Sequence, residues 1–150
     1  MDERVNLGKS SPEAYQAVIA LDRLAVAAVA EAGLTPGLGH LLKLRASQIN
    51  QCAFCVRIHS ADALKAGEAP DRLAVLPAWR ETGYFTPQER AALALTEAVT
   101  LVAQGQVPDE VYEAAAVHLT PAQISAVEWL AVVINAWNRI AVSSRYRVAP

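Results

Sequence analysis

Two cysteines and a histidine within eight residues are the part of this sequence best suited to chemistry. Cys52 and Cys55 are the only cysteines, and His59 follows Cys55 by four residues. On an α-helix, with about 3.6 residues per turn, these three side chains share one face. A thiol reacts as its thiolate, so its ordinary pKa of about 8.5 must fall before it reacts readily near neutral pH. His59 can accept the proton of Cys55, and Cys52 is spaced to form a disulfide with Cys55. The spacing therefore predicts redox chemistry.

The same residues support two other interpretations. A buried cysteine or a helical histidine is, taken alone, more often structural than catalytic. Zinc is the second alternative, with Cys52, Cys55 and His59 as ligands and His40 as a fourth. Structural zinc sites, however, usually place Cys-x-x-Cys on a tight turn, whereas this pair leads into a predicted helix. The joint occurrence of both cysteines with a histidine on the same helix face favours a redox function. We therefore expect no bound metal and no cofactor.

The elements that must position these residues are helices. Residues 86–89 (Thr-Pro-Gln-Glu) and 120–123 (Thr-Pro-Ala-Gln) both fit a capping box with proline at the first helical position. No segment alternates with the period of two that is typical of a strand. We predict helices at about 11–32, 36–49, 51–66, 70–82 (interrupted by Pro77), 87–104, 108–118 and 121–146. The expected fold is an all-α, single-domain bundle of six or seven helices over residues 11–150, after a loose N-terminal segment, residues 1–10.

Composition limits the classes of function. The chain has 150 residues, a net charge of −2 and 53% hydrophobic residues. The length fits one domain, and the weak charge gives no reason to expect nucleic acid or an anionic membrane as a partner. The apolar runs are far shorter than the ~18 residues of a membrane span, and the opening residues do not resemble a secretory signal. We therefore expect a cytoplasmic protein whose cysteine pair cycles, and whose high apolar content indicates a homo-oligomer.

The segment from Leu41 to Cys55, followed by His59 and by residues 65–68 (Lys-Ala-Gly-Glu), closely resembles the core of the alkylhydroperoxidase D-like family. This family lies within the carboxymuconolactone decarboxylase superfamily. The likeness continues through residues 89–100 and 134–139, so it covers nearly the whole chain. The resemblance implies an all-helical subunit that assembles into trimers or hexamers. It also implies reduction of hydroperoxides at a Cys-x-x-Cys site, with electrons from an external dithiol or a redox protein.

The resemblance also implies a role for each site residue. Cys55 would be the thiol that is oxidised to sulfenic acid. Cys52 would be the resolving thiol and proton donor, and His59 a member of the proton relay. These pairings agree with those that the spacing suggests.

The sequence departs from the family at one position. Members usually carry a glutamate twelve residues before the first cysteine, and that position is His40 here. Either His40 replaces the carboxylate as the base, or the relay is broken and activity is weak or altered. An imidazole with an ordinary pKa of about 6.5 can accept a proton at pH 7, although two close imidazoles resist being charged together. We expect His40 to lie near His59 and Cys55 and to serve as the relay base. Glu97 is either a second carboxylate that approaches the site or a surface or interface residue.

Polar residues next to the cysteines and on the last predicted helix lead to two further expectations. Asn50 is expected to cap the helix that carries Cys52, which would place that cysteine in the first helical turn. Asn135, Asn138 and Arg139 form a polar strip on an apolar helix and are expected to serve subunit contacts.

The leading hypothesis is a thiol-dependent peroxidase that acts through Cys55, Cys52, His59 and His40. One alternative is a non-catalytic redox sensor or assembly protein that uses the same disulfide to change its packing. Lactone decarboxylation follows from superfamily membership alone, and it has no need of a dithiol.

Overall fold

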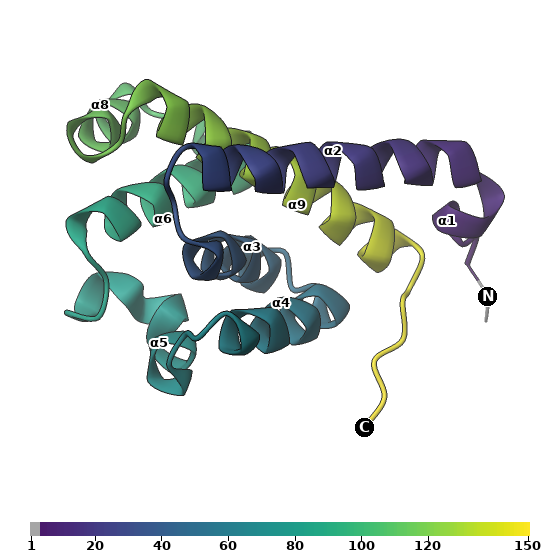
Figure 1. The fold of residues 1–150 in the computed structure, drawn as a ribbon. Coiled ribbons are helices and arrows are strands. Elements are labelled where there is room, and N and C mark those ends of the chain that lie inside the picture. Colours follow the sequence, from purple (N-terminus) through teal and green to yellow (C-terminus); the bar gives the residue numbers. More distant parts are fainter. Residues whose placement is uncertain (1–3) are drawn as a thin grey trace.

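The computed structural model describes residues 4–150, and every regular element in this range is a helix (Figure 1). The expected all-α fold is confirmed. Residues 1–3 of the segment expected to be loose lie outside the described residues, and the same segment contains the one-turn helix α1. The elements are α1 (Leu7–Ser10), α2 (Pro12–Glu31), α3 (Pro36–Ile49), α4 (Ala53–Lys65), α5 (Pro70–Val75), the 3₁₀ helix η1 (Leu76–Glu81), α6 (Pro87–Thr100), α7 (Val102–Gly105), α8 (Asp109–His118) and α9 (Pro121–Ser143).

Each predicted helix is present, and the differences are at helix ends and interruptions. The predicted helix at 70–82 is divided into α5 and η1 next to Pro77, because proline lacks the N–H that continues an α-helix. The predicted helix at 87–104 is divided at Leu101, which leaves the helical conformation between α6 and α7. Both predicted capping boxes are present and begin α6 and α9.

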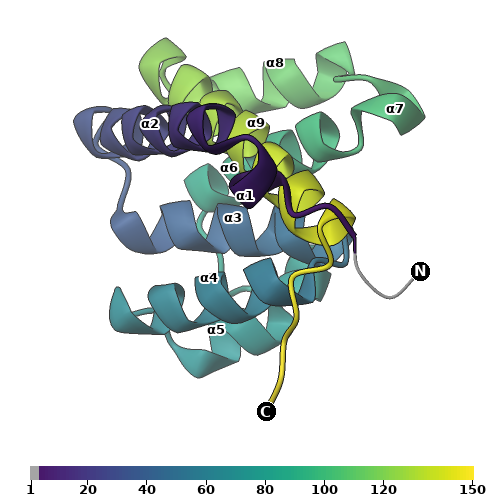
Figure 2. The same cartoon turned by 90° about the vertical axis from the view of Figure 1, so that its right-hand side faces the viewer.

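Helix α3 lies in the middle of the bundle. Figure 2 shows it between α2 on one side and α4 and α5 on the other, and it also packs against α6 and α9. Its leucines Leu41, Leu42 and Leu44 are at most 1% exposed. Because α3 is enclosed on several sides, its polar residues Lys43 and Ser47 are buried in the interior of the molecule.

A tight turn joins α3 to α4 and fixes the start of α4. Gln51 has a φ of 54°, the left-handed conformation that commonly ends a helix. The N–H of Cys52 donates to the carbonyl of Ser47 at 3.0 Å and that of Gln51 to Gln48 at 3.1 Å. These two bonds form a Schellman motif, and Cys52, its last residue, is also the N-cap of α4.

None of the helices in the described range is both long enough and apolar enough to span a bilayer.

Candidate active site

Cys52 and Cys55 are joined by a disulfide at the N-terminus of α4, with their Cα atoms 5.3 Å apart. Both residues are buried, with 2% and 4% of their surfaces exposed. The Sγ atom of Cys52 accepts a hydrogen bond from the N–H of Cys55 at 3.3 Å. The expectation that Asn50 caps this helix is wrong, because Asn50 ends α3 and Cys52 itself caps α4. The partial positive charge of the helix N-terminus therefore acts on the sulfur of Cys52, where it favours a thiolate after reduction.

A cavity of about 220 Å³ lies beside the disulfide, and Cys55 and His59 both line it. The two residues are one turn apart on α4, as the spacing predicts. The other residues around the cavity come from α2, α3, α4, α9 and the segment that follows α9: Tyr15, Asp22, Lys43, Phe54, Ile58, Trp137, Ala141 and Tyr146. Most of these side chains are apolar or aromatic, so the cavity suits a small organic molecule better than an ion.

His40 and His59 lie against each other between α3 and α4. Their ring centroids are 6.4 Å apart and the ring planes are inclined by 27°. Burial, with smaller contributions from Lys43 and His40, lowers the pKa of His59 to about 4. Burial also lowers the pKa of His40. The expected proximity of His40 to His59 is thus observed, and both rings are neutral at pH 7, so either can accept a proton.

Lys43 and Asp22 are site residues that the sequence analysis missed. Lys43 is 5% exposed, and its Nζ atom lies 2.7 Å from Oδ1 of Asp22, which also accepts a hydrogen bond from Trp137 Nε1 at 3.3 Å. Both members of this ion pair line the cavity with Cys55. A lysine within the apolar run from Leu41 to Leu44 was the available signal, because such a residue is rarely buried without a partner. The ammonium group can stabilise negative charge that develops in the cavity.

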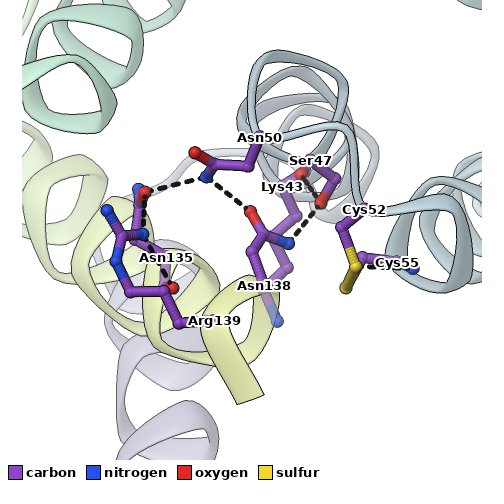
Figure 3. The surroundings of a disulfide bond; sticks show 8 residues. All are labelled: Lys43, Ser47, Asn50, Cys52, Cys55, Asn135, Asn138 and Arg139. Carbon is purple, nitrogen blue, oxygen red and sulfur yellow. Dashed lines mark hydrogen bonds between the residues drawn. A yellow bond between two sulfur atoms is a disulfide. The ribbon is translucent and has the colours of Figure 1, made fainter. Parts of the chain in front are cut away.

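A chain of hydrogen-bonded amides, of which Asn138 is buried and Asn50 and Asn135 are half-buried, lies beside the disulfide (Figure 3). Asn138, which is 1% exposed, donates to Ser47 Oγ at 3.0 Å. Asn50 Nδ2 donates to Oδ1 of Asn138 at 2.8 Å and to Oδ1 of Asn135 at 2.9 Å. The expectation that Asn138 serves subunit contacts is therefore wrong, because this side chain is buried within the chain. For the half-buried Asn135 and the exposed Arg139 it stays a prediction. The network joins α9 to the C-terminal end of α3 and so holds the turn that carries Cys52.

Glu97 does not belong to the cavity. Its carboxylate accepts hydrogen bonds from Arg45 Nε at 2.7 Å, Trp79 Nε1 at 2.9 Å and an Arg80 guanidinium nitrogen at 2.6 Å. Burial alone would raise the pKa of Glu97, but the bonds from Trp79, Arg45 and Arg80 outweigh it and hold the pKa below its usual value. Glu97 thus remains ionised within an ion-pair cluster that links α3, η1 and α6. It cannot at the same time serve Cys55 as a base.

The zinc alternative involved both thiolates, and here the two sulfur atoms are bonded to each other. The two imidazoles of the zinc alternative, His40 and His59, do lie close together, and Asp62 lies next to them. One donor atom from each of His40, His59 and Asp62 lies within 4.8 Å of the other two.

Comparison with known proteins agrees with this geometry. Residues 12–98 match the model of the carboxymuconolactone decarboxylase family. The chain belongs to this family. The uncharacterised protein YdfG of Bacillus subtilis is 34% identical over 99% of both chains. The uncharacterised protein YnjA of Escherichia coli is 32% identical over 45% of this chain and 37% of its own length.

A solved structure gives the same relationship at the level of the fold. It is that of a protein of unknown function from Agrobacterium tumefaciens, which has been suggested to be the antioxidant defence protein AhpD. The two chains share 38% identity over 99% of each, with a TM-score of 0.89. The expected resemblance of the present chain to alkylhydroperoxidase D-like proteins is therefore confirmed.

The lowered pKa of His59 predicts a specific dependence of stability on pH. An unfolded histidine titrates near pH 6.5, whereas folded His59 titrates at about 4, so between these values the unfolded state binds more protons. The free energy of unfolding therefore decreases as the pH falls from 6.5 to 4, and the contribution of His59 to this decrease is about 3 kcal/mol. Urea unfolding of the oxidised protein at several pH values, in buffer with a chelator, measures this slope. His59→Gln should reduce it, whereas the exposed control His118→Gln should not. An unchanged slope in His59→Gln would contradict the assignment.

Proposed function

We propose that the protein is a thiol-dependent hydroperoxide reductase. The observation that carries this proposal is that Cys55 shares a cavity with a neutral histidine while it is bonded to a second cysteine. Membership of the carboxymuconolactone decarboxylase family and the likeness to a suggested antioxidant protein support an antioxidant role.

In the first step, neutral His59 accepts the proton of the Cys55 thiol. The thiolate attacks the terminal oxygen of the hydroperoxide, and the O–O bond breaks. The departing alkoxide takes the proton from His59 and leaves as an alcohol, and Cys55 becomes a sulfenic acid. Lys43, which lines the cavity together with its ion-pair partner Asp22, stabilises the negative charge that passes from sulfur to oxygen.

In the second step, Cys52 attacks the sulfur of the sulfenic acid. Its position as the N-cap of α4 favours the thiolate that this attack needs. A disulfide forms and the hydroxyl group of the sulfenic acid leaves as water, with a proton returned through the histidines. An external dithiol or redox protein then supplies two electrons by thiol–disulfide exchange. A reducing compartment such as the cytoplasm would maintain this supply.

His40 extends the relay from the cavity. Its ring faces that of His59, with the ring centroids 6.4 Å apart, and in this proposal it takes over the proton and returns His59 to the neutral form. Its position corresponds to the usual glutamate of the family, so the proposal assigns it the role of that carboxylate.

We expect the purified protein to consume an organic hydroperoxide repeatedly in the presence of excess dithiol. Cys55→Ser should abolish consumption, because the nucleophile is lost. Cys52→Ser should still react once and accumulate sulfenic acid, because the resolving thiol is lost. Peroxide consumption with several dithiols, together with intact mass, measures both effects. One oxidation per chain without turnover, in the presence of every donor, would instead indicate a redox sensor.

His40→Ala is expected to slow the oxidation of Cys55 by roughly 10²-fold, the low end for loss of a general base. His40→Glu should recover much of the rate and move the acid limb of the pH profile downward, because a glutamate ordinarily titrates about two units below histidine. Stopped-flow oxidation across a range of pH measures these rates, and circular dichroism controls for folding. Equal rates in the native protein and His40→Ala at every pH would show that His40 only packs against His59.

We also propose a homo-oligomer, a trimer or hexamer by family resemblance. Large apolar side chains are exposed on α2 and α9, two helices that pack together. The exposed fractions are 69% for Leu24, 47% for Val26, 51% for Trp129 and 45% for Val132. Burial of these side chains would favour association. Light scattering across a tenfold dilution should give a mass that is a multiple of 16.0 kDa, and Trp129→Arg should lower it. A monomer at all concentrations would contradict the proposal.

A further inference from the structure

Three potential metal ligands from two helices converge beside the disulfide. His40 comes from α3, and His59 and Asp62 come from the same face of α4, three residues apart. One donor atom from each, either an imidazole nitrogen or a carboxylate oxygen, lies within 4.8 Å of the other two. The close packing of α3 on α4 therefore produces a cluster of mixed nitrogen and oxygen donors that involves neither cysteine.

The hydrogen bonding of these side chains leaves donor atoms available. The Nδ1 atoms of His40 and His59 are both buried and have no hydrogen-bond partner among the described residues. A buried polar atom without a partner is unfavourable, and coordination of an ion by these nitrogens would supply the missing partner. Asp62 makes a long ion pair, 3.9 Å, with the largely exposed Lys65. The carboxylate of Asp62 can therefore rotate toward a metal ion without breaking a short contact.

The local charge does not oppose a cation. Lys43 is close enough to lower the pKa of both imidazoles, and alone it would repel a metal ion. Its charge is balanced by Asp22, 2.7 Å away. Asp62 then contributes a negative charge next to two neutral rings.

We propose that His40, His59 and Asp62 bind one divalent first-row transition-metal ion of the Zn²⁺ type. Two imidazoles and one carboxylate are ligands that Zn²⁺ accepts in sites with three protein ligands and an open position, and they also suit Fe²⁺. Tetrahedral coordination at metal–ligand distances of about 2.0–2.1 Å requires donor atoms about 3.3 Å apart. The donor atoms lie within 4.8 Å of one another, so binding requires them to move closer together by up to about 1.5 Å.

This site differs from a zinc site built on the cysteines. Because it uses no sulfur ligand, it is compatible with the disulfide, and its affinity can be measured on the oxidised protein without peroxide or dithiol. The binding measurement is therefore separate from the peroxidase assay, and an ion held by His40 and His59 would withdraw both imidazoles from the proposed proton relay. A protein that binds the metal but reduces no peroxide, or the reverse, is a distinguishable result.

The test is titration of the oxidised, chelator-treated protein, without a polyhistidine tag, with ZnCl₂ in a calorimeter. One Zn²⁺ should bind per chain, and Asp62→Asn and His59→Gln should each weaken binding by at least about tenfold. The matched controls are Asp71→Asn and His118→Gln, which change an exposed aspartate and an exposed histidine outside the cluster. They should leave the affinity unchanged. Circular dichroism establishes that each variant is folded.

Titration with CoCl₂ reports on the ligands by a second route. Visible d–d absorption without a sulfur-to-cobalt charge-transfer band is expected for nitrogen and oxygen ligands. Absence of binding by the native protein would overturn the proposal. Binding that Asp62→Asn and His59→Gln leave intact, or that His118→Gln removes, would overturn it as well.

Discussion

The site depends on the short turn between α3 and α4, because this turn fixes where the sulfur atoms lie. The Schellman bonds to Ser47 and Gln48 end α3 within three residues of the next helix, and Cys52 takes part in both structures. Gln51 adopts a left-handed conformation that costs about 1–2 kcal/mol for a residue other than glycine. This cost must be offset by the packing of α3 on α4 and by the amide network of Asn50, Asn135 and Asn138. The position of the disulfide therefore rests on interactions that extend to α9.

Burial of the site has two opposite electrostatic consequences. It removes water from His59 and so makes its protonated form unfavourable, which keeps the imidazole available as a base at neutral pH. It would also disfavour a thiolate at Cys55. The buried Lys43 offsets this second effect, because it faces the same cavity and its charge is held there by Asp22. A cavity with a neutral base and a fixed cation suits a reaction in which negative charge moves from sulfur to oxygen.

Much of the fold could be predicted from the sequence, because the signals are local. Thr86 and Thr120 begin helices through side-chain bonds to residues three positions later, and such bonds depend on short-range spacing alone. The face shared by Cys55 and His59 is likewise a property of one helix. The role of Asn138 could not be predicted, since its partners Ser47 and Asn50 are about 90 residues away in the chain. A polar side chain on an apolar helix gives the same sequence pattern in two cases. It can contact another subunit, or it can bind an amide within its own subunit.

In the proposed relay, His40 stands where the family resemblance implies a glutamate, and this difference changes the electrostatics around His59. A carboxylate beside His59 would favour the imidazolium and raise the pKa of His59, whereas His40, when charged, has the opposite effect. His59 is therefore a weaker base in this chain than it would be beside an anion, but it stays unprotonated to a lower pH. With His40 at this position, His59 is thus a weaker base that remains neutral over a wider range of pH. His40 also provides, with His59, the pair of nitrogen donors that forms the inferred metal site together with Asp62.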